Sequence, residues 1–183
     1  MANIKFPPSA LLPKSWPKTS KIPRIVITNT LTLFCLHQIN RLALLQTLHS
    51  QITVPTAVQF ELEAGQAQGL SIPNLNDLSW ITLTSAKASF LPNVTDLGEG
   101  EAEVMALGIE NPGSLLILND ALGRQIAQLH NSTYTGTLGV LIRAKQLGYV
   151  EHVNLLITSL QAKGMWLTPS IIENVLKIAK EQA

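Results

Sequence analysis

Short apolar runs alternate along this chain with longer segments in which apolar residues recur every three or four positions. The runs predict strands, and the longer segments predict amphipathic helices. The expected strands are 25–28, 51–54, 80–83, 115–118 and 133–135. The expected helices are 30–36, 40–49, 55–65, 98–110, 121–130, 137–147, 151–163 and 170–181. This alternation predicts a three-layer α/β/α fold, with a central parallel sheet of about four or five strands and helices on both faces.

Proline and glycine set several of the expected boundaries. Pro55 is expected to open one helix and Gly65 to close it, and the polar stretch 66–79 is expected to be a loop. Thr168 is the expected N-cap of the last helix, with Pro169 at its first position.

The first 23 residues differ from the rest, because they hold five prolines, four lysines and no acidic residue. Such a density of proline disfavours helix and strand, so we expect an extended basic arm at 1–23 and one domain at 24–183. With Arg24 this end carries five positive charges, whereas the remainder has eight basic and twelve acidic side chains. The arm is expected to pair with the acidic surface of its own or a neighbouring subunit, or with nucleic-acid phosphates.

Composition narrows the class of protein. Hydrophobic residues make up 46% and charged residues 14%, which indicates a folded core. No apolar run reaches the ~18 residues of a membrane span, and the N-terminus lacks a signal-peptide core. The single Cys35 cannot form an intrachain disulfide, and no cysteine–histidine cluster has zinc spacing. We therefore expect a cytoplasmic protein.

Acidic residues are concentrated in 61–120, with nine carboxylates against one basic residue. A solvated acidic surface explains this as readily as a site that gathers carboxylates around divalent cations. At about 100° per residue, Glu99, Glu103 and Glu110 share a helix face that we expect to be wet. Glu101 instead lies beside the apolar positions, at the edge of the core.

Four polar residues are expected near the carboxyl ends of the strands: Asn29, Glu61, Glu101 and Asp120. In a parallel sheet these ends converge on one edge, where ligands bind. Simpler roles are available, since Asp120 suits a helix N-cap and Glu101 complements a helix dipole. If the three carboxylates do meet they repel one another, and a divalent metal is the natural neutraliser.

Five stretches carry a resemblance to a known family: IVITNT, ITVPTAVQFELEAG, DLGEGEAEVMALG, LLILNDALGRQIA and YTGTLGVLIRAKQLGYV. In order and spacing they resemble PIN-domain proteins of an uncharacterised prokaryotic branch, akin to the VapC-like toxins of toxin–antitoxin pairs. The resemblance runs from about Arg24 to Ala179. It implies a PIN-like α/β/α fold and a ribonuclease that depends on Mg²⁺ or Mn²⁺.

The resemblance also implies roles for individual residues. The acidic quartet of the family maps by position to Asn29, Glu61, Glu101 and Asp120, of which the three acids would be metal ligands. The hydroxyl groups of Thr30 and Thr137 would hold water or phosphate. The guanidinium groups of Arg124 and Arg143 would hold the nucleic-acid backbone.

Two departures from the family pattern leave the function open. Family members usually have aspartate where Asn29 stands, and often two acids where this chain has Asn119 and Asp120. An asparagine oxygen brings no charge, so metal binding is expected to be weakened. One interpretation is a weak metal-dependent endoribonuclease. The alternative is an inactive PIN domain that binds RNA or a protein, such as an antitoxin-like partner.

Other expectations are simpler. A nucleotide-binding fold is disfavoured, because no G-x-G-x-x-G follows the first strand and no G-x-x-x-x-G-K-[ST] is present. PIN-like domains commonly dimerise, so a symmetric homodimer is the default expectation.

Overall fold

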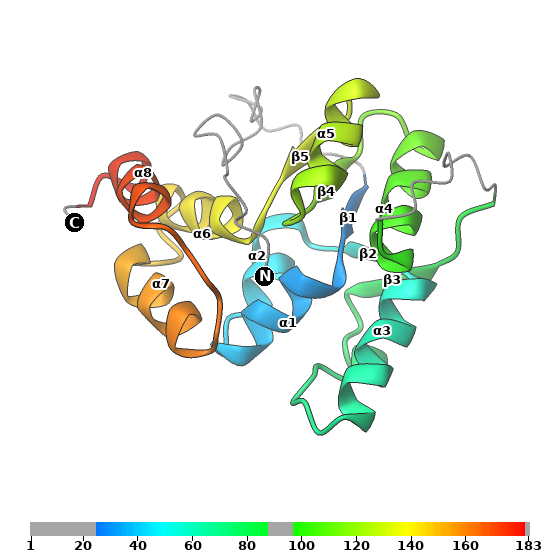
Figure 1. Ribbon diagram of the computed structural model, residues 1–183, viewed down its shortest axis with the longest axis horizontal. Coiled ribbons are helices and arrows are strands. Elements are labelled where there is room, and N and C mark those ends of the chain that lie inside the picture. The colour runs from blue at the N-terminus through cyan, green and yellow to red at the C-terminus, as the bar shows by residue number, and fades with distance from the viewer. Residues whose placement is uncertain (1–24, 88–96, 182–183) are drawn as a thin grey trace.

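A five-stranded parallel sheet forms the centre of the molecule (Figure 1). The computed structural model describes residues 25–87 and 97–181, so the expected arm at 1–23 lies outside the described residues. The strand order is β3-β2-β1-β4-β5, and every neighbouring pair is parallel. The strands are β1 (Val26–Thr28), β2 (Ile52–Pro55), β3 (Ile81–Thr84), β4 (Leu115–Ile117) and β5 (Thr133–Thr135). The prediction of a parallel α/β sheet is confirmed.

Helices connect the strands and then extend the chain. The first group is α1 (Thr30–Gln38), α2 (Ala43–His49), α3 (Thr56–Ala67) and the short 3₁₀ helix η2 (Leu75–Asp77). The second group is α4 (Glu99–Glu110), α5 (Ala121–Leu129), α6 (Thr137–Gln146), α7 (Val153–Ala162) and α8 (Pro169–Ala179). No helix among the described residues is long and apolar enough to cross a membrane.

The helices form two layers around the sheet. The chain moves one way from β1 to β3 and the other way from β3 to β5, so right-handed connections place helices on both faces. α4 packs against β1, β2 and β4 beside α5, whereas α2 packs on β2 and, with α1, contacts α6 (Figure 1). α7 and α8 pack against α6 and complete the C-terminal part.

The carboxyl ends of the central strands lie level with one another. Thr28 at the end of β1 pairs with Ile117 at the end of β4, and Ile117 pairs with Thr135 at the end of β5. All three residues are fully buried. The residues that follow these strands therefore leave the sheet at one edge, as expected for a ligand crevice in this class of fold.

Gly65 does not end its helix, so that part of the sequence prediction is wrong. α3 begins at Thr56, directly after Pro55, and continues to Ala67. The chain leaves the helix at Gly69, whose φ of 85° is the left-handed conformation that suits glycine just after a helix. Gly65 lies inside the helix, and its carbonyl accepts a hydrogen bond from the Leu70 N–H at 3.1 Å.

Glu103 does not face water, contrary to the expectation from helical spacing. Its carboxylate accepts hydrogen bonds from the N–H groups of Ala57, at 2.7 Å, and Ala86, at 3.0 Å. No side chain caps the N-terminus of α3, because Pro55 stands at its N-cap position. Glu103 supplies that missing acceptor from α4, and its charge complements the positive end of the α3 dipole.

Candidate acidic site

Asn29 lies between β1 and α1 and is 1% exposed. Its Oδ1 accepts hydrogen bonds from the backbone N–H of Thr32, at 3.2 Å, and from the Thr32 hydroxyl, at 3.0 Å. The N–H of Thr32 can only donate, so the amide oxygen must face the helix and the amide nitrogen must face away from it. That nitrogen, Nδ2, has no hydrogen-bond partner among the residues that the structure describes.

Glu61 on α3 joins three helices through its carboxylate. Oε1 accepts a hydrogen bond from the Gly100 N–H at 2.8 Å, and Oε2 accepts one from the Thr30 hydroxyl. The contact with α4 requires glycine, because a Cβ at position 100 would lie 2.5 Å from Glu61 Oε2. The Thr30 hydroxyl thus donates to Glu61, and its role in holding water or phosphate stays a prediction.

Glu101, in the first turn of α4, has a perturbed carboxyl group. Burial raises its pKa above the ordinary value, and the negative charges of Asp120 and Glu61 raise it further. The Gly98 N–H and the Asn29 side chain act in the opposite direction. The Asn29 contact falls outside the geometry of an ordinary hydrogen bond, since Nδ2 has no such partner. The three predicted carboxylates therefore share one electrostatic neighbourhood, with the Asn29 nitrogen beside it.

Replacing Glu101 with glutamine is expected to change how stability depends on pH. Because the folded-state pKa is raised, the folded protein binds more protons than the unfolded chain between the two pKa values. Wild-type stability should therefore fall as pH rises from the unfolded pKa through the folded pKa. Glu101→Gln should make stability depend less on pH and should raise the free energy of unfolding at neutral pH. Urea denaturation at a series of pH values measures the free energy of unfolding and its pH dependence. Glu99→Gln, on the exposed side of α4, is the control.

The other side of the site is held by asparagine and threonine side chains. Asn119 Nδ2 donates to the hydroxyls of Thr32, at 2.8 Å, and Thr137, at 2.9 Å, and its Oδ1 accepts the Thr137 N–H at 3.0 Å. These residues are buried and uncharged. With Asn29 they form a neutral network that joins the ends of β1 and β4 to the start of α6. Thr137 lies inside this network. Its role in holding water or phosphate stays a prediction.

Asp120 caps the helix that follows it. Its Oδ2 accepts the Gly123 N–H at 2.6 Å, as the simpler of the two sequence interpretations expected. The same carboxylate raises the pKa of Glu101, so the capping role and a place in the acidic site coexist.

The two predicted nucleic-acid contacts lie in different places. Arg124 is 7% exposed and donates from Nε to the Leu118 carbonyl at 2.8 Å. Burial lowers its pKa to about 10, although Tyr134 and Asp120 act to raise it. Arg143 is half-buried on α6. Burial lowers the pKa of His49 to about 4, and the charge of Arg143 lowers it further. The burial of Arg124 favours a structural role, and a contact with nucleic acid stays a prediction for both arginines.

These side chains do not form a ready site for Mg²⁺ or Mn²⁺. Such ions bind oxygen ligands, whereas Asn29 turns a nitrogen into the site and commits its oxygen to the helix cap. Both Glu61 oxygens already accept hydrogen bonds. Within 25–87 and 97–181, no group of three or more acidic, histidine or cysteine side chains is placed to hold a metal ion. The donor set therefore does not fit a hard cation in this arrangement.

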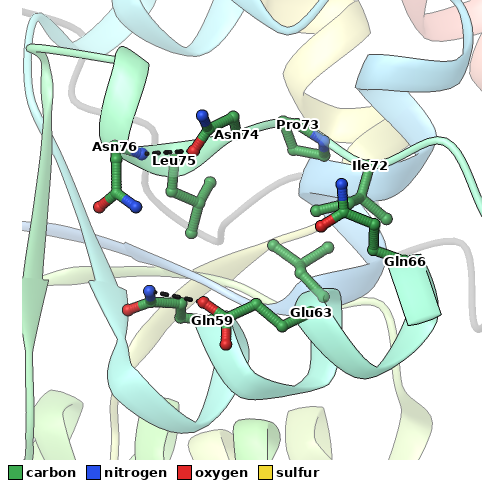
Figure 2. A pocket seen from close by; sticks show the side chains of 9 residues that line it. Gln59, Glu63, Gln66, Ile72, Pro73, Asn74, Leu75 and Asn76 are labelled. Atoms are coloured by element: carbon green, nitrogen blue, oxygen red, sulfur yellow. Dashed lines mark hydrogen bonds between the residues drawn. The ribbon is translucent and has the colours of Figure 1, made fainter.

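A hollow of about 300 Å³ lies between α3 and the loop that follows it. Figure 2 shows Gln59, Glu63 and Gln66 of α3 on one side and the loop with Asn74 and Asn76 on the other. Gln59 donates to Glu63 at 2.8 Å, and Asn74 Oδ1 accepts the Asn76 N–H at 3.2 Å. This hollow was not predicted from the sequence, because its residues have the pattern of a polar loop beside a helix.

An open parallel sheet with Glu61, Glu101 and Asp120 close enough to influence one another defines an α/β protein with a candidate acidic site. A family model described as a PIN domain matches residues 25–181 of this chain. The chain therefore belongs to the PIN-domain family, as the resemblance implied. No curated protein and no solved structure matches it.

Proposed function

We propose that this PIN-domain protein binds RNA without cutting it, as a binding or regulatory module. Membership of the family supports the binding of nucleic acid. The proposed lack of cleavage is supported mainly by the orientation of Asn29, because its amide nitrogen rather than its oxygen faces the acidic site. An amide N–H repels a cation and cannot ligate it, so the three carboxylates lack the fourth acidic ligand that the family supplies.

A weak metal-dependent endoribonuclease is the second candidate. The observation in its favour is that the charges of Asp120 and Glu61, in addition to burial, raise the pKa of Glu101. Three carboxylates in one neighbourhood attract divalent cations even without a well-formed site. The toxin-like role, the antitoxin-like partner and the homodimer belong to the predictions that the resemblance implies.

The test uses the full chain and a labelled single-stranded RNA. Fluorescence anisotropy is expected to show the same affinity in EDTA and in Mg²⁺ or Mn²⁺, and electrophoresis is expected to show intact RNA. If all five positive charges of residues 1–24 contact phosphates, the slope of log K against log salt should be roughly −3.5. Absence of binding would contradict the proposal.

Cleavage by the wild type would favour the second candidate instead. That cleavage should require Mn²⁺ or Mg²⁺ and should disappear in Glu61→Gln. Gln59→Glu, on the same helix and outside the acidic site, is the control for a change of charge on α3.

A further inference from the structure

An apolar pocket of about 240 Å³ opens beside the acidic site, between α1, α3 and the loop after α3. α1 and α3 lie next to each other in Figure 1 and are in contact. The pocket wall is mainly apolar, with two carboxylates at one side, and its main residues are Leu31, Phe34, Leu70, Ile72, Glu61 and Glu101. Leu31 and Leu70 are 43% and 48% exposed. The pocket is therefore an accessible apolar surface that leads to negative charge.

Two features of this place define the chemistry of its ligand. The wall accepts an apolar group, and the carboxylates of Glu61 and Glu101 at its side accept a cation. A metal ion satisfies only the second requirement. RNA brings phosphates that the carboxylates repel. A peptide with an apolar side chain and a basic side chain meets both requirements.

The chain carries such a peptide upstream of β1. An apolar residue, a proline and a basic residue occur in that order three times, as Leu12-Pro13-Lys14, Trp16-Pro17-Lys18 and Ile22-Pro23-Arg24. Proline favours an extended conformation in the residue before it. In an extended segment residues i and i+2 point to the same side. Each triplet can therefore present its apolar and basic groups together, as the pocket requires.

Reach distinguishes the three triplets. The acidic site follows the carboxyl end of β1, whereas the third triplet ends at Arg24, immediately before Ile25 at the opposite end. Lys14 lies eleven residues before Ile25, a span of at most about 40 Å. A compact domain of this length has a radius of gyration of about 16 Å. The chain between Lys14 and Ile25 is thus long enough to reach around the domain, so that residues near Lys14 can lie at the carboxyl end of β1.

We propose that residues 11–18 dock in this pocket of the same chain, with the ammonium of Lys14 or Lys18 beside the Glu61 and Glu101 carboxylates. Leu12 or Trp16 then covers the apolar wall. The N-terminal arm is in this way an internal ligand that covers the acidic site. The inference does not rest on RNA binding.

Zero-length cross-linking with a carbodiimide tests this on the full chain without RNA. The reagent joins an amine to a carboxylate only when the two are in contact, and peptide mass spectrometry locates the bond. The expected products, on monomeric protein, join Lys14 or Lys18 to Glu61 or Glu101. Leu70→Asn, which makes the wall polar at an exposed position, should lower their yield about tenfold.

A matched variant separates docking from general effects. Leu129→Asn changes an 81% exposed leucine outside the pocket and should leave the yield unchanged. Circular dichroism confirms that both variants fold. Products spread equally over distant carboxylates such as Glu151 and Glu173, or a yield that Leu70→Asn does not lower, would overturn the proposal. So would products found only between two chains, since the arm would then occupy a second copy.

Discussion

Aspartate in place of Asn29 is expected to give this protein a divalent-cation site that the wild type lacks. One carboxylate oxygen would keep the helix cap by accepting the Thr32 N–H. The other would take the place of Nδ2 and face the neighbourhood of Glu101. Like charges at such proximity shift a carboxyl pKa by about 1–3 units, or roughly 1.4–4 kcal/mol. In EDTA the variant should be less stable than the wild type by an amount in this range.

Mn²⁺ should reverse that loss, because it binds the folded variant and not the unfolded chain. At one hundred times its dissociation constant, the ion restores about 2.7 kcal/mol. Chemical denaturation with EDTA or Mn²⁺ measures this, and the stability of the wild type should be equal in both. RNA cleavage should appear in the variant alone.

Asn76→Asp provides the control for the change in net charge. This residue is exposed on the loop after α3 and lies outside the acidic site. Its variant should show neither the loss of stability in EDTA nor the recovery in Mn²⁺. If Asn29→Asp behaves like this control, the orientation of the amide does not decide cation binding, and the proposed function loses its main support.

Alanine in place of Gly100 is expected to disrupt the contact between α3 and α4. Its Cβ would lie 2.5–2.9 Å from both oxygens and the carboxyl carbon of Glu61, so the carboxylate must move away. Glu61 would then lose the hydrogen bonds from Thr30 and the Gly100 N–H. Overpacking and lost bonds to a charged group together cost about 2–4 kcal/mol of unfolding free energy.

Gly65→Ala is the matched substitution, since Gly65 also lies inside a helix. A Cβ there meets Leu70 at 3.4 Å, which is an ordinary contact. Alanine should stabilise α3 by about 0.5–1 kcal/mol through its helix propensity. Urea denaturation should thus move the two variants in opposite directions. Equal effects would show that the Glu61 carboxylate can move away from a Cβ at position 100 without lowering the free energy of unfolding.

The hydrophobic periodicity and the positions of helix-capping and helix-breaking residues were sufficient to predict the fold. The apolar runs and the helical spacing placed all five strands within one or two residues. Burial on both faces imposes that pattern most strongly on β1 and β4, which are buried throughout. Thr168 caps α8 through its hydroxyl, which accepts the Ile171 N–H at 3.3 Å, as the Thr-Pro pair predicted. Local signals of this kind depend on neighbours in the chain, so they can be read without tertiary structure.

The errors came from contacts between residues distant in sequence. Helical angles separated Glu101 from Glu103 correctly, yet gave Glu103 to water because they carry no information about the N-terminus of α3. Likewise, the sequence shows that Asn29 lacks a charge but not which end of its amide faces the site. That depends on the Thr32 N–H and hydroxyl, which fix the orientation only in the folded chain.

The neutral network of Asn29, Thr32, Asn119 and Thr137 has a consequence for how this scaffold could change. Asn119 donates to two hydroxyl groups, which a carboxylate cannot do. An acidic residue at either position alone would add buried charge without a complete ion site to offset it. Two such changes made one at a time are therefore each expected to lower the free energy of unfolding, whereas an ion site needs both. If no ion binds in the present form, its free energy of unfolding should be equal with and without a chelator.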